Sequence, residues 1–190
     1  MKDLVEIRWH SRGGQGAKTG ALVLAEAAMD EGKYIQGFAE YGPERMGAPM
    51  KAYNRVSSSP ITVHYGITNP DVVVILDTTL IDRVDVTEGL SEDGVIIVNT
   101  PESAADMRSL LGVEGRSIFT IDASKISRDN IGRDIPNTPM IGALLKVTNM
   151  MDIDGVIKSI RRKLGSKLRP EIVEGNVKAI KQAYEEVKGE

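Results

Sequence analysis

The most constraining stretch of the chain is a glycine-rich turn near the N-terminus, where three glycines occupy four positions, Gly13-Gly14-Gln15-Gly16. An apolar, strand-like segment over residues 4–10 leads into this turn. An alanine-rich segment over residues 16–31, with small apolar residues at helical spacing, follows it. Glycine adopts positive φ angles without strain, so the backbone can turn sharply and approach a bound group closely. The pattern predicts a strand–turn–helix unit whose free helical N–H groups face the turn.

A unit of this kind is typical of sites that hold a phosphate. The stretch is not a P-loop, because Ala17 stands where glycine must precede the Lys-Thr pair. It is also not a clean dinucleotide fingerprint, since Thr19 takes the place of the third glycine or alanine. Glycines that only allow close packing are the alternative. The candidate anion-binding residues are Arg12, Gly13, Gly14, Gln15, Gly16, Lys18 and Thr19.

Length and composition exclude several classes of protein. A chain of 190 residues predicts one domain over residues 1–190, large enough to bury a core. The net charge of −3 and the 4% aromatic content argue against nucleic-acid binding. No apolar run approaches the roughly 20 residues that span a membrane. The first residues lack the pattern of a signal peptide, so a cytoplasmic location is expected.

The chemistry available to the chain is limited. It contains no cysteine, which excludes disulfides, thiol nucleophiles and cysteine-ligated iron–sulfur clusters within this chain. Its two histidines, His10 and His64, are far apart and lack the spacing of metal ligands, so no metal site is expected. No nucleophile elbow or catalytic triad is present. We therefore predict no catalytic residue and expect a binding role, as in a subunit of a larger enzyme.

The remaining apolar pattern predicts an α/β fold. Residues 34–39 read as a second strand, which would pair in parallel with the first. Residues 50–56 and 61–66 resemble a β-hairpin, and the runs at 71–77, 95–98 and 118–121 read as buried strands. Short amphipathic segments lie between these runs, near residues 79–90 and 101–111. We expect a mainly parallel sheet with helices on its faces and an inserted or edge β-hairpin.

The last third of the chain is predicted to be helical. One helix starts near residue 137 with Thr138 as its cap, and others span residues 153–164 and 170–187. This helical part, residues 137–190, is expected to pack on the same domain and cover a face of the sheet. Six basic residues and no acidic one lie between Lys158 and Arg169. The run could dock an acidic partner or meet a phosphate, or it could be a solvated helix face.

A loop rich in glycine, proline and charge follows the second predicted strand. Ligand crevices in open α/β sheets lie at the carboxyl ends of strands, so this loop is a candidate site or partner contact. A solvated surface loop with an exposed ion pair is the alternative. Its candidate residues are Tyr41, Gly42, Pro43, Glu44 and Arg45.

Four motifs carry a family resemblance over nearly the whole chain. They are Ile7–His10 with Gly13–Gly16, the loop Glu40–Pro49, the strand Pro70–Asp77, and Pro136–Ala143. In this order they resemble the gamma subunits of the 2-oxoacid:ferredoxin oxidoreductase family. The ending Gly47-Ala48-Pro49 resembles the pyruvate and 2-oxoisovalerate branch more than the 2-oxoglutarate or indolepyruvate branches.

The resemblance implies a function for the complex and a role for this chain. The complex converts pyruvate, coenzyme A and oxidised ferredoxin to acetyl-CoA, CO2 and reduced ferredoxin. The resemblance places thiamine diphosphate and the iron–sulfur clusters on partner subunits, named alpha, beta and delta. The gamma subunit then contributes assembly and coenzyme A binding. By this resemblance the glycine turn, with Arg12, Gln15 and Lys18, would meet a phosphate of coenzyme A, and Tyr41–Arg45 with Asn137 and Thr138 would form a partner or site surface.

Three alternatives remain open at this point. The substrate could be 2-oxoisovalerate, because the reacting centre lies on other chains. The chain could be a free-standing nucleotide-binding oxidoreductase built on the strand–turn–helix unit. It could also be a scaffold that binds partners but no small molecule.

Overall fold

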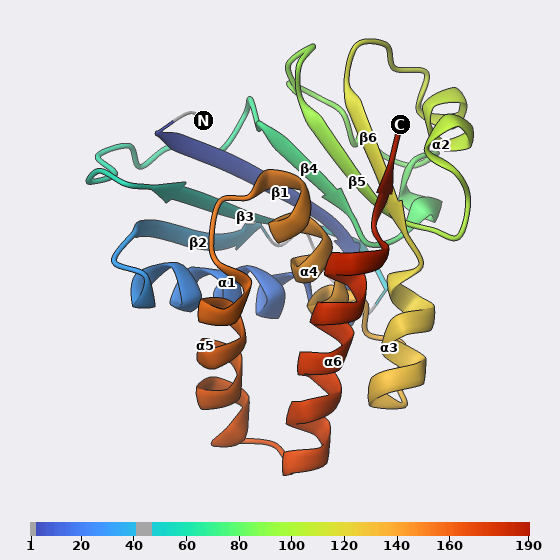
Figure 1. Ribbon diagram of the computed structural model, residues 1–190. Coiled ribbons are helices and arrows are strands. Elements are labelled where there is room, and N and C mark those ends of the chain that lie inside the picture. The colour runs from blue at the N-terminus through green and yellow to red at the C-terminus, as the bar shows by residue number, and fades with distance from the viewer. Residues whose placement is uncertain (1–2, 41–46) are drawn as a thin grey trace.

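The computed structural model describes residues 3–40 and 47–190, and within them the chain forms one twisted sheet with helices on both faces (Figure 1). The strands are β1 (Leu4–Arg12), β2 (Tyr34–Glu40), β3 (Pro49–Ser57), β4 (Val72–Ile75), β5 (Val95–Asn99), β6 (Ser117–Ile121) and β7 (Lys188–Gly189). Their order across the sheet is β2-β3-β1-β4-β5-β6-β7.

The centre of the sheet is parallel and its edges are antiparallel. Strands β1, β4, β5 and β6 pair in parallel, whereas β3 pairs antiparallel with both β1 and β2, and β7 pairs antiparallel with β6. This arrangement confirms the predicted α/β class with a parallel centre. The neighbouring strands β2 and β3 form the edge hairpin.

Two of the predicted strand pairings are wrong. Residues 61–66 form no strand, so the hairpin does not join them to residues 50–56. Strands β1 and β2 run in the same direction but do not pair, because β3 lies between them. The physical reason is that β3 pairs along the whole of β1, from Leu4 opposite Ser57 to Arg12 opposite Pro49. Pairing over this length outweighs the local alternation at residues 61–66.

The helices are α1 (Ala17–Asp30), α2 (Ala104–Leu111), α3 (Ala123–Ile131), α4 (Asn137–Thr148), α5 (Ile153–Gly165) and α6 (Pro170–Glu186), with a short 3₁₀ helix η1 (Thr78–Leu80). Most of the predicted segment 79–90 is turns rather than helix. Thr138 is not the cap of α4, because the helix begins directly after Pro136 and no side chain caps it. No bounds were predicted for helix α3, and strand β7 lies within residues 137–190, which were predicted to be helical; it is a strand because the residues after α6 pair with β6.

Two apolar cores lie on opposite faces of the sheet. In the larger core, α1 and α4 cover one face, and α5 and α6 pack on them as a further layer (Figure 1). On the other face, η1 and α2 cover β4, β5 and β6. The part of this second face over β1, β2 and β3 carries polar side chains such as Arg8, His10 and Arg55. On this second face, the sheet is therefore apolar and covered over β4, β5 and β6 but polar over β1, β2 and β3.

The only tryptophan of the sequence fixes α1 against the sheet. Trp9 is fully buried, and its Nε1 donates a hydrogen bond to Oδ1 of Asn54 at 2.9 Å. The amide of Asn54 in turn donates to the carbonyl of Ala21 in α1 at 2.9 Å. Buried polar groups need such partners, and here they connect two layers. The fluorescence of Trp9 is therefore a probe of global unfolding.

On the opposite face of β1, a buried histidine stays neutral. His10 is 1% exposed, and its Nε2 accepts a hydrogen bond from Nε of Arg8 at 3.0 Å. Burial first, and then the charges of Arg8 and Lys51, lower the pKa of His10 to about 3. Arg8 also donates to the carbonyls of Val86 at 3.1 Å and Glu88 at 2.6 Å. The imidazole thus supports an arginine that ties the loop before β5 to the sheet.

This histidine predicts a sensitivity to acid. Between pH 6.5 and about 3 the unfolded chain binds one more proton at His10 than the folded chain, so the free energy of unfolding falls as pH falls. The slope from this group approaches about 1.4 kcal/mol per pH unit. Urea titrations of the wild type and His10→Gln, followed by Trp9 fluorescence from pH 7 to pH 4, should show the wild type losing more stability than the variant. Parallel curves would contradict a neutral, buried His10.

Candidate switch-point network and basic cleft

The glycine turn lies at the carboxyl end of β1, as predicted, and leads directly into α1. Gly14 has a φ of 104° and Gly16 a φ of 84°, backbone angles that residues other than glycine rarely adopt. Gly13 instead extends the pairing with the start of β3: its N–H donates to the carbonyl of Ala48 at 2.9 Å, and its carbonyl accepts from Gly47 at 3.1 Å. The turn is therefore fixed on one side to the residues that lead into β3.

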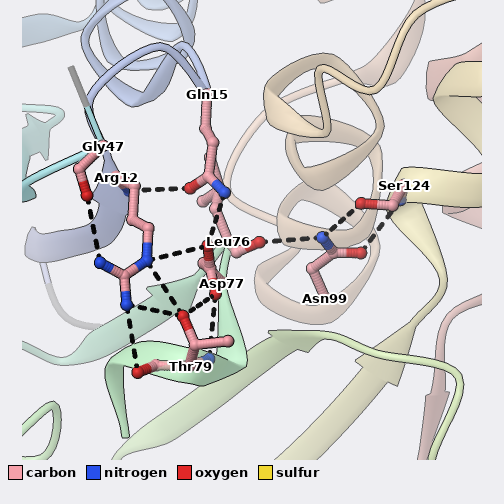
Figure 2. Close-up of polar contacts among 8 residues, drawn as sticks. All are labelled: Arg12, Gln15, Gly47, Leu76, Asp77, Thr79, Asn99 and Ser124. Atoms are coloured by element: carbon pink, nitrogen blue, oxygen red, sulfur yellow. Dashed lines mark hydrogen bonds and ion pairs between the residues drawn. The ribbon is translucent and has the colours of Figure 1, made fainter. Parts of the chain in front are cut away.

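The turn borders the topological switch point, where the chain connections from two adjacent strands lead to opposite edges of the sheet. From β1 the chain proceeds to α1 and the β2 edge, whereas from β4 it proceeds to β5 and β6. Open α/β sheets place their ligand crevice at such a point, outside the carboxyl ends of the two strands. In this structure four side chains fill that space: Arg12 at the end of β1, Gln15 in the turn, and Asp77 and Thr79 after β4 (Figure 2).

These four side chains form a closed network, which we call the switch-point network. The guanidinium of Arg12 donates to the carbonyl of Gly47 at 3.1 Å and to Oγ1 of Thr79 at 2.7 Å, and it lies 3.3 Å from Oδ2 of Asp77. The amide nitrogen of Gln15 donates to the same carboxylate at 2.7 Å, and its oxygen accepts from the N–H of Arg12 at 2.7 Å. Arg12 and Gln15 therefore hold the turn in place.

Asp77 is the anionic centre of the network. Burial acts to raise the pKa of its carboxyl. The hydrogen bonds from Thr79 and Gln15, together with the charge of Arg12, outweigh burial and leave this pKa below its ordinary value. The carboxylate thus stays ionised and balances Arg12.

A second polar bridge continues the network along the strand ends. The amide nitrogen of Asn99 donates to the carbonyl of Leu76 at 2.9 Å and to Oγ of Ser124 at 3.0 Å (Figure 2). Its oxygen accepts from the N–H of Ser124 at 3.0 Å. The pocket beside this bridge, about 560 Å³, is lined by Asp77, Asp122 and Asp134 and by one cation, Arg128, which pairs with Asp134 at 2.7 Å. Its acidic lining does not suit an anion.

The other side of the glycine turn faces a different cavity, which we call the basic cleft. It has a volume of about 520 Å³ and lies among the turn, the start of α4 and the tip of the α5–α6 pair. Apolar side chains such as Ile141, Ile160 and Leu164 line it. It brings together five of the predicted site residues: Gly14, Gly16, Thr19, Asn137 and Thr138. Arg12, Gln15 and Lys18 are not among its lining residues.

Asn137 explains why Gly16 is a glycine. Its amide nitrogen donates to the carbonyl of Gly16 at 3.0 Å, and it is only 6% exposed. A Cβ at Gly16 would lie 2.6 Å from this nitrogen, which is too close. Close packing against α4 therefore requires a glycine at position 16.

Three exposed cations surround the basic cleft: Arg133, Lys167 and Arg169. Among the residues that the structure describes, none of them has an ion-pair partner. Other members of the basic run are bound within the chain: Arg161 pairs with Glu174, Arg162 with Asp30, and Lys163 with Glu26. The run thus divides into residues that fix α5, residues at the cleft, and Lys158, which is exposed on α5 outside the cleft. Arg133 carries no local signal by which the sequence could single it out.

The structure does not describe residues 41–46 of the loop after β2, which was predicted as a site or partner contact. Tyr41, Gly42, Pro43, Glu44 and Arg45 lie outside the described residues. Across residues 3–40 and 47–190, no group of three histidine, cysteine or carboxylate side chains is placed to hold a metal ion. In the same two ranges, no helix is long and apolar enough to cross a membrane.

Comparison with known proteins gives a consistent family assignment. The chain is 46% identical to "Pyruvate synthase subunit PorC" of Thermotoga maritima over 187 residues, which cover 98% of this chain and 96% of that protein. It is 43% identical over 182 residues to the "Pyruvate/ketoisovalerate oxidoreductases common subunit gamma" of Pyrococcus abyssi, with 96% of each chain covered.

Solved structures agree with the sequence relatives. The crystal structure of PORC from Thermotoga maritima superposes with a TM-score of 0.87 at 43% identity, and 99% of each chain is covered. The 2-oxoglutarate:ferredoxin oxidoreductase from Magnetococcus marinus shares the fold, with a TM-score of 0.76 at 18% identity; the match covers 96% of this chain and 31% of that one. Residues 6–186 match the family described as "Pyruvate ferredoxin/flavodoxin oxidoreductase". The chain belongs to the pyruvate ferredoxin/flavodoxin oxidoreductase family.

Proposed function

We propose that this chain is the gamma subunit of a pyruvate synthase, the complex that converts pyruvate, coenzyme A and oxidised ferredoxin to acetyl-CoA, CO2 and reduced ferredoxin. The observation that carries this proposal is the 46% identity to a pyruvate synthase subunit over 98% of the chain. The relative named as common to pyruvate and ketoisovalerate oxidoreductases keeps 2-oxoisovalerate as the second candidate substrate. One such subunit can serve both substrates if the reacting centre lies on other chains.

The proposed partners are the alpha, beta and delta subunits, with ferredoxin as the electron acceptor of the complex. Thiamine diphosphate and the iron–sulfur clusters belong to those partners in this proposal, because the chain has no cysteine to ligate a cluster. Residues 1–190 act as one domain of the assembly, and we place the complex in the cytoplasm.

For coenzyme A, we propose the basic cleft rather than the switch-point network. Arg12 and Gln15 are engaged with Asp77 and Thr79, so a phosphate would have to displace them. The cleft offers the exposed Gly14, the first turn of α1, and the cations Lys167 and Arg169. Its apolar lining suits the uncharged part of coenzyme A. The structural neighbour from Magnetococcus marinus was solved with coenzyme A bound.

A kinetic experiment on the assembled complex tests this assignment. The double variant Lys167→Ala, Arg169→Ala should raise the KM for coenzyme A about tenfold or more, since charge-assisted contacts to phosphate are lost. The KM for pyruvate should stay unchanged. Lys158→Ala, which removes an exposed cation of α5 outside the cleft, is the matched control. An unchanged KM for coenzyme A in the double variant would contradict the assignment of coenzyme A to the basic cleft.

An anaerobic pull-down tests the function as a whole. The tagged chain, expressed in its native cells, should co-purify with cysteine-rich subunits and show iron–sulfur absorption. The eluate should reduce a dye in a coenzyme A-dependent reaction, and the preferred oxoacid, pyruvate or 2-oxoisovalerate, identifies the substrate. A colourless chain that elutes alone with a bound nucleotide would instead favour a free-standing oxidoreductase.

A further inference from the structure

Half of the aromatic residues of this chain gather on one face of the sheet. The sequence has five tyrosines, two phenylalanines and one tryptophan. Tyr34 and Phe38 alternate along β2 beside Ser57 and Tyr53 of β3, and the rings of Phe38 and Tyr53 stack with their centroids 5.0 Å apart. Tyr65 approaches the same face from the segment after β3. We call these four residues the aromatic strip.

The strip surrounds a buried arginine whose hydrogen bonds are incomplete. Arg55 is 1% exposed; its Nε donates to Oε1 of Glu6 at 2.6 Å and its Nη1 to Oε1 of Gln36 at 2.9 Å. Its guanidinium carbon lies 5.8 Å from the ring centre of Phe38 and 5.2 Å from that of Tyr65. Its Nη2 is buried and has no acceptor in the chain that the structure describes. Buried donors in folded proteins rarely lack a partner.

Arg55 lines an open pocket of about 500 Å³, together with Gln36, Phe38, His64 and Tyr65. This pocket lies on the face of the sheet opposite α1, because the alternate residues Gly37 and Asn54 contact that helix. It is thus separate from the basic cleft. Tyr65 is 67% exposed and Tyr34 is 46% exposed.

The place of the strip in the sheet also favours a contact with another protein. Strand β2 is the last strand at its end of the sheet, and within the described residues no strand pairs with its outer edge. Exposed tyrosines around an arginine are the composition enriched at the centres of protein–protein interfaces. The strip therefore combines an open edge, exposed rings and a donor that lacks an acceptor.

We propose that the aromatic strip docks another subunit of the complex, which inserts a carboxylate side chain beside Nη2 of Arg55. A carboxylate supplies the planar acceptor that a guanidinium prefers. Among the described residues, the two acids that contact Arg55 and Tyr53 are already engaged: Glu6 accepts from Arg55, and Glu40 accepts from the hydroxyl of Tyr53 at 2.8 Å. A symmetric pair of copies would need a spare acid within this same surface, so a different chain fits better. The inference rests on the proposed function.

The test measures binding of the purified chain to the complex reconstituted without it, under anaerobic conditions. Tyr65→Ala, which changes a largely exposed residue, should raise the Kd at least tenfold, and Arg55→Lys should do the same. Leu110→Ala, which alters a half-exposed residue on α2 away from the strip, is the matched control and should leave the Kd unchanged. If Arg55→Lys lowers the melting temperature of the free chain markedly, Tyr65→Ala alone decides.

A photo-crosslinker placed at position 65 should then label a partner subunit at an aspartate or glutamate, or within a few residues of one. If the wild-type chain binds and both variants bind with the same Kd, the docking surface is overturned but the proposed function stays intact. If the wild-type chain binds no partner, both the docking surface and the proposed function are overturned.

Two results would assign the pocket to another occupant. Protection of the Arg55 side-chain N–H groups by millimolar acetate or pyruvate in the free chain would assign the pocket to a small carboxylate. A dimer of the free chain that Tyr65→Ala abolishes would assign it to a second copy. Either result overturns the proposal.

Discussion

Replacing Gly142 with alanine is expected to lower the free energy of unfolding by about 3 kcal/mol. Gly142 lies inside α4, and a Cβ at this position would come within 2.2 Å of the carbonyl oxygen and 3.0 Å of the carbonyl carbon of Ile180 in α6. Backbone atoms of a packed helix cannot move aside as a flexible side chain can, so α4 and α6 would have to separate. This cost exceeds the gain of about 1 kcal/mol that alanine brings to a helix.

The matched control is Gly165→Ala at the last position of α5, where a Cβ would meet no atom within 4 Å. The same substitution should there change stability by less than about 1 kcal/mol, in the stabilising direction. Urea unfolding followed by Trp9 fluorescence compares the two variants directly. Equal effects would mean that the α4–α6 contact is looser than the structure shows.

The elements that depend on local pattern could be predicted from the sequence. The run Val72–Ile75 reads as a strand buried on both faces, and it lies at the centre of the sheet with both neighbours parallel. The glycine turn was predicted for the same reason, because positive φ angles at Gly14 and Gly16 have a sequence signature.

Features that depend on distant pairing could not be predicted in this way. Nothing local to Pro49–Ser57 shows that this strand enters between β1 and β2, since the insertion is decided by its pairing with both. The alternation of Ile61, Val63 and Tyr65 suggested a strand, but the first two are only half-buried and Tyr65 is exposed over Arg55.

The site shows the same division. The sequence shows that Arg12 directly precedes the turn and that Gln15 lies within it, but that Asp77 engages both depends on β4 lying beside β1. The basic run was visible as well. Its separation into paired residues such as Arg161 and a cleft residue such as Lys167 depends on how α5 packs. Side-chain partners that come from distant segments decide which predicted residues remain available for a ligand.

The switch-point network gives the second large effect. Replacing Asp77 with alanine should lower the free energy of unfolding by about 2–4 kcal/mol, because hydrogen bonds to a charged group contribute about 1.5–3 kcal/mol each and are not additive. The carboxylate accepts from Gln15 at 2.7 Å and from the N–H and hydroxyl of Thr79 at 2.9 and 2.6 Å, and it balances Arg12. Without it, a largely covered guanidinium loses its counter-charge.

Asp82→Ala, which removes an exposed acid a few residues later, is the control and should change stability by less than about 0.5 kcal/mol. The stability of Asp77→Asn should fall between those of the two alanine variants, since asparagine keeps an acceptor but not the charge.

The same three variants can be assayed in the complex. Only Asp77→Ala should raise the KM for coenzyme A, because Gln15 and Arg12 position the turn that borders the basic cleft. A large loss of stability with an unchanged KM would confine the network to holding β1 and β4 together, and the cleft would then bind its ligand independently of the strand ends.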